Sequence, residues 1–395
     1  MKYTFSDRVS SLKGSAIREI FKYAADPQVI SLAGGNPAPE LFPHKELSEI
    51  AREMLAEQPV LSLQYGVTEG YGVLREQVRE RLMRKEKIDT KTNDVLIVSG
   101  GQQGIDLLSK VVLNEGDTVI VEEPSFIGAL NTFRSYNAHL VGVSMDEDGM
   151  NIEALEKALQ ENPNTKIIYT IPTFQNPSGI TMSQAKRRAL YEVASRYDVL
   201  VLEDNPYGEL SFDGTHHDTI KSIDTEGRVV YSGSFSKILS PGIRVGFICA
   251  APEIIAKMTV AKQTNDVHTP MITQLMVSEY LKRYDIDALI EQMRALYAQK
   301  SATMLKAIDR YFPKEVTHTT PTGGLFVWAT LPQQYDTLAL SKRCVERKVV
   351  YVPGNTFMVD MEKPCSSLRL NYSTMTDERI EEGVRVLGEI FSELD

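Results

Sequence analysis

The sequence predicts an α/β fold: a large domain with a mostly parallel sheet and helices on both faces, joined to a smaller α+β domain. Short apolar runs alternate with helical patterns from residue 94 to residue 232, which is typical of βαβ units. The chain has 395 residues, too many for one ordinary domain. Apolar residues at helical spacing then begin at Ile286 and mark a long helix. We therefore expect an arm and loop over 1–45, a large domain over 46–285, and a bridging helix with a small domain over 286–395.

The elements follow in order from these patterns. The arm is expected to hold a short helix over 15–21, and helices over 43–57 and 74–86 precede the sheet. The expected strands of the large domain are 94–98, 118–121, 139–143, 166–170, 199–202 and 229–232, with helices over 105–113, 128–136, 152–160 and 183–196. The long helix runs to about residue 311. The small domain is expected to contain strands at 324–329, 349–352 and 367–371 and helices at 337–347 and 376–394.

Composition and charge exclude several classes of partner. The net charge is −10, which argues against nucleic acid and anionic membranes as main partners. Cys249, Cys344 and Cys365 are odd in number and widely spaced, so neither a disulfide framework nor a zinc site is indicated. His216-His217-Asp218 has no further clustered ligands, and no metal is expected. The N-terminus has no apolar signal core, so we expect a cytoplasmic protein.

The most informative stretch runs from Ser232 to Gly246, directly after an apolar strand pattern. Ser234 and Ser236 precede Lys237, and Arg244 follows it by seven positions. A buried lysine amine loses its proton readily and can attack a carbonyl, while serine hydroxyls and an arginine suit a phosphate monoester. A cofactor with both an aldehyde and a phosphate fits this set, and pyridoxal 5'-phosphate is the obvious one. Alone, the stretch is equally compatible with a strand-end loop carrying a solvated lysine.

Other polar residues also follow predicted strands. Gly100, Gly101 and Gln102 come after the strand that ends at Val98, and Asn176 comes after the strand that ends at Thr170. Ligands of open parallel sheets bind beyond the carboxyl ends of the strands. Asp204 and Tyr207 follow the strand over 199–202, and Lys237 follows the next one. These residues should therefore meet at one edge of the sheet.

Each residue of this set matches one part of the cofactor. A buried carboxylate at Asp204 would keep the pyridine nitrogen protonated, and Asn176 and Tyr207 can donate to the phenolate oxygen. Gly101 and Gln102 would offer backbone N–H groups to the phosphate, Phe126 could stack on the ring, and Arg369 could hold a carboxylate. Singly, these residues are better explained as a strand cap, a turn, a core aromatic and a solvated edge. Their joint order on one edge favours the cofactor.

This set resembles the class I/II aminotransferases of pyridoxal-phosphate fold type I. The resemblance rests on Asn176-Pro177-Ser178-Gly179, Asp204-Asn205-Pro206-Tyr207, Ser234-Phe235-Ser236-Lys237 with Arg244, and Arg369. Within the family the chain is most similar to the α-aminoadipate/kynurenine aminotransferase group, through Ser15 to Ile20, Ala33 to Pro39, Leu63 to Gly66 and Gly100 to Gly104. It departs from many relatives at Phe126, where they have tyrosine, and from several at Gly101, where they have serine.

The resemblance implies a homodimer with shared active sites, in which Tyr65 reaches the phosphate in the neighbouring subunit. Lys237 would carry the cofactor and move the substrate proton, with Asp204 and Tyr207 as further catalytic residues. Arg369, Asn176, Gly35 and Arg18 would bind substrate. The expected reaction transfers an amino group from an L-amino acid of the 2-aminoadipate, aromatic, glutamate or branched-chain type to a 2-oxo acid such as 2-oxoglutarate, in ping-pong fashion through pyridoxamine phosphate.

Other functions stay open at this point. The same fold type hosts β-lyases and other pyridoxal-phosphate enzymes, because a fold does not fix a reaction. A regulator-like cofactor-binding module is more remote, since the residues before the glycine loop are too few for a DNA-binding domain. For Arg18, a solvated helix charge is the simpler interpretation, and only the resemblance favours a contact with substrate. A nucleotide-binding protein ranks last, because the glycine turn lacks a phosphate-loop ending.

Overall fold

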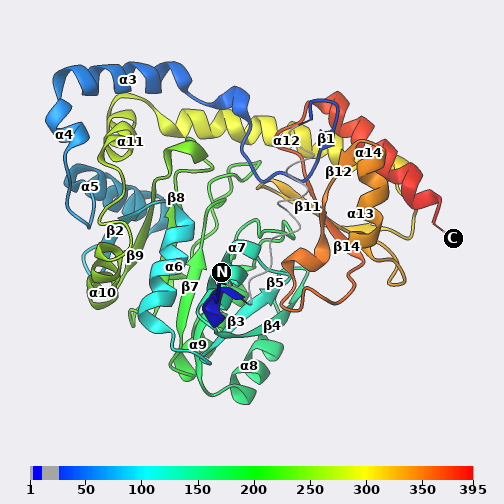
Figure 1. Cartoon of the computed structure of the whole chain (residues 1–395), viewed down its shortest axis with the longest axis horizontal. Coiled ribbons are helices and arrows are strands. Elements are labelled where there is room, and N and C mark those ends of the chain that lie inside the picture. Colours follow the sequence, from blue (N-terminus) through cyan, green and yellow to red (C-terminus); the bar gives the residue numbers. More distant parts are fainter. Residues whose placement is uncertain (1–2, 11–25, 395) are drawn as a thin grey trace.

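The computed structural model describes residues 3–10 and 26–394 of the chain, and two sheets organise that part of it (Figure 1). The larger sheet has eight strands in the order β2-β9-β8-β7-β6-β3-β4-β5, and the smaller has four in the order β10-β11-β14-β13. Helix α12 (Ile286–Tyr311) runs along the top of the molecule from one sheet to the other. The expected α/β architecture with a smaller second part is confirmed.

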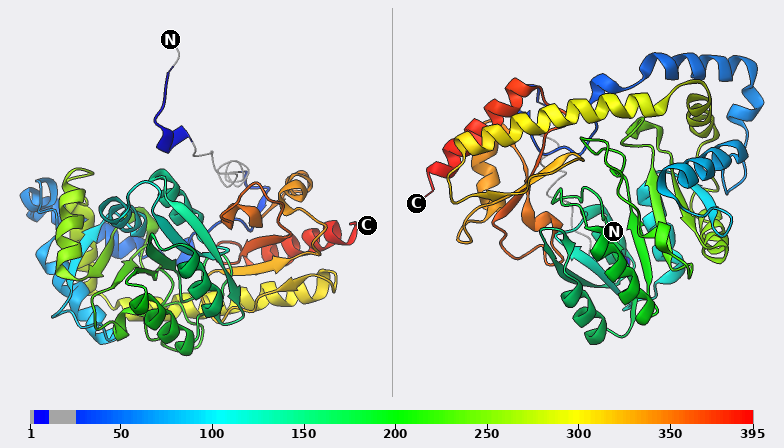
Figure 2. Two further views of the ribbon diagram at one scale, coloured as in Figure 1. Left: turned by 90° about the horizontal axis from the view of Figure 1, so that it is seen from below. Right: turned by 180° about the vertical axis from the view of Figure 1, so that it is seen from behind.

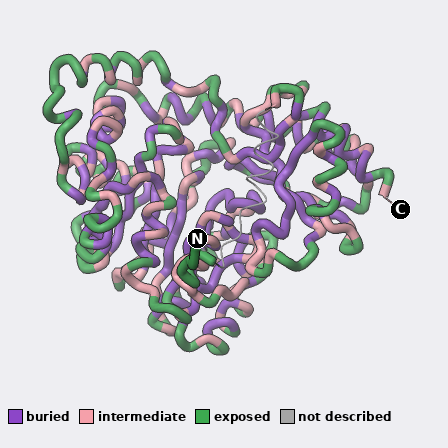
Figure 3. Tube along the Cα trace, in the orientation of Figure 1, coloured by how far each residue is buried: buried purple, intermediate pink, exposed green. Residues whose placement is uncertain are grey.

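Seven of the eight strands of the large sheet are buried almost completely, whereas most of β4, next to the edge strand β5, is partly or fully exposed. Because neighbouring residues of a strand face opposite sides, uninterrupted burial means that both faces of the sheet are covered. Figure 3 shows this continuous burial along the strands. The strands are β2 (Asp94–Val98), β3 (Thr118–Glu123), β4 (His139–Asp146), β5 (Gly149–Met150), β6 (Thr165–Thr170), β7 (Leu200–Asp204), β8 (Val229–Ser234) and β9 (Gly246–Ala250).

Strand β9 is absent from the sequence prediction. It lies between β2 and β8 and is antiparallel to both of them. After Lys237 and Arg244 the chain reverses and enters β9 directly. Among the described residues no α-helix separates β8 from β9, so the alternation of strands and helices did not predict this strand. Because β9 opposes both neighbours, β2 and β8 still point the same way. The carboxyl ends of β2, β6, β7 and β8 therefore share one edge of the sheet, as the sequence predicted.

The helices around the large sheet include several that were not predicted, namely α4, α10 and α11. Asn151 and Ser183 cap α8 and α9 by accepting hydrogen bonds from helix N–H groups, as N-cap side chains do. The predicted helix over 15–21 lies outside the described residues. The helices are α1 (Asp7–Ser10), α3 (His44–Glu57), α4 (Pro59–Leu63), α5 (Gly72–Arg81), α6 (Gly101–Val112), α7 (Ile127–Ser135), α8 (Ile152–Glu161), α9 (Gln184–Arg196), α10 (Pro252–Gln263) and α11 (Met271–Arg283).

The smaller sheet carries Arg369 on its strand β14. The elements of this part are β10 (Thr317–His318), β11 (Phe326–Thr330), β13 (Val352–Pro353), β14 (Ser367–Asn371), α13 (Thr337–Glu346) and α14 (Asp377–Ser392). Strand β1 (Ile30–Ser31) pairs in parallel with β12 (Val349–Val350), so a segment from the beginning of the chain joins this part. The two views of Figure 2 show α12 and α14 packed side by side along it. The boundaries at residues 45 and 285 stay a prediction.

Close packing joins α14 to the end of α12. A methyl group added at Gly388 would lie 2.3 Å from the backbone oxygen of Tyr311, which is far inside contact distance. Backbone atoms cannot move aside as a flexible side chain can. Only glycine at position 388 therefore allows the two helices to approach this closely.

We expect Gly388→Ala to lower the free energy of unfolding by about 1–3 kcal/mol, because overpacking displaces backbone atoms. Urea unfolding followed by circular dichroism measures this change. Gly72→Ala is the matched control, since no atom lies within 4 Å of an added methyl group there. Alanine is the better helix former, so the control should be neutral or slightly stabilised. Equal unfolding midpoints for the two variants would contradict the packing explanation.

Candidate active site

A cavity of about 540 Å³ lies at the carboxyl ends of the large-sheet strands, beneath Arg369 from the small sheet. It collects most of the residues that the sequence singled out. The predicted residues that line it are Gly35, Gly101, Gln102, Phe126, Asn176, Asp204, Tyr207, Ser234, Ser236, Lys237, Arg244 and Arg369. Gly100 lies immediately beside Gly101. Tyr65 does not line the cavity and is 81% exposed, and Arg18 lies outside the described residues.

Lys237 faces the cavity from the loop after β8. Its Nζ donates a hydrogen bond to the backbone oxygen of Gly35 at 2.6 Å. Burial lowers the pKa of Lys237 to about 8, and the positive charges of Arg369 and Arg244 act in the same direction. A substantial share of this amine is therefore neutral near pH 8, and only the neutral form can attack a carbonyl carbon.

Asp204 ends β7 at the floor of the cavity, and the hydroxyl of Tyr169 donates a hydrogen bond to its Oδ2 at 2.9 Å. Burial raises the pKa of Asp204 to about 6, and the hydrogen bond from Tyr169 opposes that rise. Tyr169 on β6 is fully buried and was missed by the sequence analysis. The available signal was weak: a tyrosine in an otherwise apolar buried strand needs a partner for its hydroxyl.

The first residues of α6 and the loop after β8 form a cradle suited to an anion. Helix α6 begins at Gly101, so its first N–H groups have no acceptor within the helix and carry the positive end of the helix dipole. Gly100 has a φ of +83°, and an added methyl group there would lie 2.3 Å from Nη2 of Arg244. Glycine therefore lets the guanidinium lie against the turn. Ser234 and Ser236 complete the cradle.

The Arg369 guanidinium closes the cavity from the small sheet. Its Nη1 donates to Oδ1 of Asn176 at 2.8 Å, and its Nη2 donates to the backbone oxygens of Ala33 and Gly34 at 2.7 and 3.2 Å. Burial lowers the pKa of Arg369 to about 10. Among residues 3–10 and 26–394, no carboxylate pairs with this cation, and its Nε has no hydrogen-bond partner. A buried, unpaired guanidinium beside a cavity suits a carboxylate ligand.

Tyr207 and Asn176 lie on the same wall. The amide of Asn176 donates to the Tyr207 hydroxyl at 3.4 Å, and burial raises the pKa of that hydroxyl above its ordinary value. The Tyr207 hydroxyl therefore stays protonated and can donate to an anionic oxygen. Phe126 contributes an aromatic ring to the lining, at the start of α7.

These groups fit pyridoxal phosphate. The cradle of Gly101, Gln102, Ser234, Ser236 and Arg244 supplies donors for a phosphate, and the cavity carries an amine at Lys237 for the aldehyde. Asp204 offers a carboxylate to the pyridine nitrogen. Arg369 leaves a separate cationic position for a substrate carboxylate.

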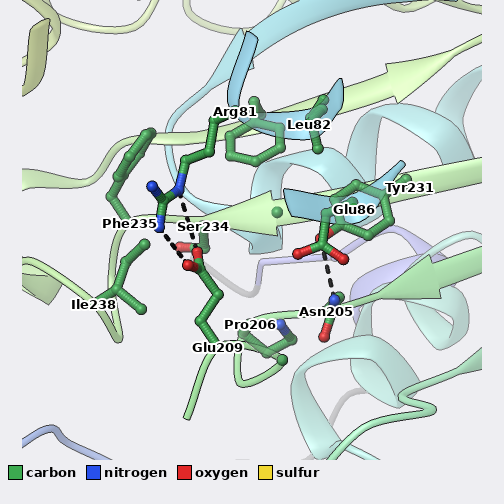
Figure 4. A pocket seen from close by; sticks show the side chains of 13 residues that line it. Arg81, Leu82, Glu86, Asn205, Pro206, Glu209, Tyr231, Ser234, Phe235 and Ile238 are labelled. Carbon is green, nitrogen blue, oxygen red and sulfur yellow. Dashed lines mark hydrogen bonds and ion pairs between the residues drawn. The ribbon is translucent and has the colours of Figure 1, made fainter. Parts of the chain in front are cut away.

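A second cavity lies behind this site but is far smaller, about 30 Å³. Figure 4 shows its walls: Arg81 is paired with Glu209 on one side, and the Asn205 amide donates to the Tyr231 hydroxyl at 3.1 Å on the other. Burial raises the pKa of Glu86 in its wall to about 8, with Glu209 and Glu203 adding to the effect. The volume suffices for one or two water molecules and excludes a cofactor or an amino acid. The larger cavity is therefore the candidate active site.

Comparison with known proteins identifies the family. The pattern described as aminotransferase class I and II matches residues 27–387. The chain belongs to the class I and II aminotransferases. It is 41% identical to aromatic-amino-acid aminotransferase 1 of Thermococcus litoralis over 98% of this chain and 94% of that protein. It is also 41% identical to the 2-aminoadipate transaminase of Thermus thermophilus, over 97% and 95% of the two chains.

A solved relative extends the match to the structure. The kynurenine aminotransferase of Pyrococcus horikoshii, determined with PMP, superimposes with a TM-score of 0.94 at 38% identity, over 98% of this chain and 97% of that one. This aminotransferase is thus a pyridoxal-phosphate-dependent enzyme that moves an amino group between an amino acid and a 2-oxo acid. The predicted family, fold type and cofactor are confirmed. No helix in the described ranges is long and apolar enough to cross a membrane.

Removing the Tyr169 hydroxyl should change the charge of Asp204. Burial raises the pKa of Asp204, and Tyr169→Phe removes one of the two hydrogen bonds that oppose it, leaving the one from Ser232, so the pKa should rise further above 6 and the charged form should require more alkaline solution. Loss of a hydrogen bond to a charged group costs about 1.5–3 kcal/mol, which corresponds to about one to two pKa units. Binding of pyridoxal phosphate to the apoenzyme can be followed by absorbance from pH 5 to 9. The loss of affinity on the acid side should begin at a higher pH in Tyr169→Phe than in the wild type.

Tyr231→Phe is the control for this experiment. Tyr231 is also a buried tyrosine, but its hydroxyl accepts a hydrogen bond from the neutral amide of Asn205. Loss of the Tyr231 hydroxyl should not change the pH at which the affinity for pyridoxal phosphate falls. Coincident profiles for Tyr169→Phe and the wild type would show that Tyr169 does not influence the charge of Asp204.

Proposed function

We propose that this aminotransferase accepts L-amino acids of the 2-aminoadipate, aromatic, glutamate and branched-chain types, with 2-oxoglutarate as the amino acceptor, in a ping-pong reaction. The observation that carries the proposal is the unpaired, buried Arg369 guanidinium facing the same cavity as the low-pKa amine of Lys237. Every such substrate has an α-carboxylate for the arginine and an α-amino or α-oxo group within reach of the lysine. The named relatives act on aromatic and 2-aminoadipate substrates, which supports this range.

Bound pyridoxal phosphate supplies an electron sink that stabilises negative charge at the substrate α-carbon. The residues of this chain do the remaining work. Lys237 takes the α-proton as a general base, which its lowered pKa favours near neutral pH. Asp204 keeps the ring nitrogen protonated, and Tyr207 and Asn176 donate to the ring oxygen. Phe126 stacks on the ring face.

The remaining roles concern the phosphate and the substrate. Gly101 and Gln102 donate backbone N–H groups to the phosphate, with Ser234, Ser236 and Arg244, while Gly100 leaves room for the Arg244 side chain. Gly35 lets the backbone approach the substrate, and Arg369 holds the α-carboxylate together with Asn176. Arg18 remains our candidate for the distal carboxylate of 2-aminoadipate and glutamate. Cys249, Cys344 and Cys365 are buried free thiols, which supports a reducing, cytoplasmic location.

We further propose that the enzyme is a homodimer with shared active sites. Helix α4 and the loop after it carry large apolar side chains on the surface: Val60 is 75% exposed, Leu63 71%, Tyr65 81% and Val67 61%. Four large exposed apolar side chains within eight residues of the sequence favour a protein interface. A second copy covering these side chains would bring Tyr65 to the phosphate of its neighbour.

Borohydride reduction of the holoenzyme tests the role of Lys237. The reduced cofactor should be recovered on a single peptide that contains Lys237. Lys237→Ala should lose at least four orders of magnitude in the rate of the first half-reaction, because both the attachment point and the general base are removed. A label on another lysine would contradict the assignment. Lys221→Ala, at a buried lysine that does not line the cavity, controls for losses due to unfolding.

Mixing inactive subunits tests the shared sites. Lys237→Ala and Tyr65→Ala proteins should each be impaired, Tyr65→Ala by about tenfold if it loses one charge-assisted hydrogen bond to the phosphate. A heterodimer contains one site with both native residues, so activity should reappear after the mixture is unfolded and refolded together. Activity that never exceeds the sum of the two separate proteins, or a fully active monomer in sedimentation, would refute shared sites.

A further inference from the structure

The phosphate cradle depends on Ser99, the residue that joins β2 to the turn at Gly100. Its N–H donates to Oε1 of Gln103 at 2.8 Å, and its backbone oxygen accepts from Nη2 of Arg244 at 3.0 Å. Its hydroxyl donates to Oδ2 of Asp266 at 3.0 Å. Ser99 therefore links the cradle arginine to a side chain that does not line the cavity. The position of the turn depends on what holds Gln103 and Asp266.

Both of these residues are bound by Lys262 on α10. Its side chain is fully buried, and Nζ donates to Oε1 of Gln103 at 2.6 Å and to the two carboxylate oxygens of Asp266 at 2.9 and 3.0 Å. The Gln103 amide in turn donates to Oδ2 of Asp266 at 2.7 Å. The ammonium thus has its hydrogen bonds satisfied without water.

The charges of this cluster depend on one another. Burial lowers the pKa of Lys262, and the hydrogen bond and charge of Asp266 oppose that change. Burial alone would raise the pKa of Asp266, but hydrogen bonds from Lys262, Gln103 and Ser99 outweigh it and keep the pKa below its usual value. Removing the Lys262 charge would leave the partly exposed Asp266 carboxylate without its cation, and Asp266 would turn further toward water.

We propose that Lys262, Asp266 and Gln103 are positioning residues that fix the phosphate turn and Arg244 from behind. The inference rests on the proposed role of this turn and Arg244 in holding the cofactor phosphate. Lys262 does not line the cavity, so it acts only through Gln103, Asp266 and Ser99. A loosened turn would weaken the hold on the phosphate and leave the contacts to the pyridine ring unchanged.

Dissociation constants of the full-length apoenzyme for two probes separate these effects. Pyridoxal phosphate and pyridoxal share the ring and the aldehyde, but pyridoxal has no phosphate. Lys262→Met keeps the length of the side chain and removes its charge. We expect the dissociation constant for pyridoxal phosphate to rise about tenfold or more, and that for pyridoxal to stay within about twofold of wild type. Fluorescence titration measures both constants.

Lys221→Met is the matched control. Lys221 is as buried as Lys262 and forms an ion pair with Asp224 at 2.8 Å, and it does not line the cavity. Its loss should lower the unfolding temperature and leave both dissociation constants unchanged. Asp266→Asn serves if Lys262→Met fails to fold, because it keeps the side-chain shape and an acceptor oxygen. It should show a smaller loss, about threefold, again confined to pyridoxal phosphate.

Three results would overturn the inference. Unchanged affinity for pyridoxal phosphate in Lys262→Met and Asp266→Asn would show that the cluster does not position the turn. An equal loss for both probes would show a general structural defect. Equal affinity of the wild-type protein for the two probes would remove the proposed phosphate site itself, which distinguishes failure of the proposed function from failure of the positioning role.

Discussion

The buried guanidinium of Arg369 is the interaction on which the arrangement of the site depends. A cation withdrawn from water is strongly unfavourable unless its donors are satisfied. Arg369 satisfies three of its five N–H groups, through Asn176 in the loop after β6 and through the carbonyls of Ala33 and Gly34 near the beginning of the chain. One side chain thereby holds three distant segments around the cavity. Among the described residues no carboxylate pairs with Arg369, so its charge can attract an anionic ligand.

The charge around the cavity is opposite to that of the protein as a whole. The chain carries a net charge of −10, yet Lys237, Arg244 and Arg369 line a cavity whose carboxylate is Asp204. A positive cleft in an acidic protein concentrates anionic ligands while the outer surface repels them. Burial lowers the pKa of Lys237, and the charges of Arg369 and Arg244 lower it further, so the two arginines that attract anions also favour the neutral amine.

The sequence was sufficient for the site residues that follow strands, because buried parallel strands bring their carboxyl ends together. Lys237, Asp204 and Asn176 were found in this way, and the cavity unites them. Tyr169 and Lys262 could not be found similarly. The partner of Tyr169 depends on which strand lies beside β6, and Lys262 in a helix is indistinguishable from a solvated charge until the packing is known. Strand β9 was not predicted because it follows β8 in the antiparallel direction, without a helical pattern between the two strands.

Helix α12 couples the two sheets mechanically. It is continuous over 26 residues, about 39 Å in length, and contains neither proline nor glycine, the residues at which helices most often kink. The hydroxyl of Tyr297 accepts from the N–H of Ala38, and Lys300 is paired with Glu40 at 2.7 Å, so the loop that includes Gly35 is fastened to this helix. A rotation of this helix at one sheet therefore displaces its other end at the second sheet. A tilt of the whole helix by about 5° about one end would move the other end by about 3 Å without altering a single turn of the helix.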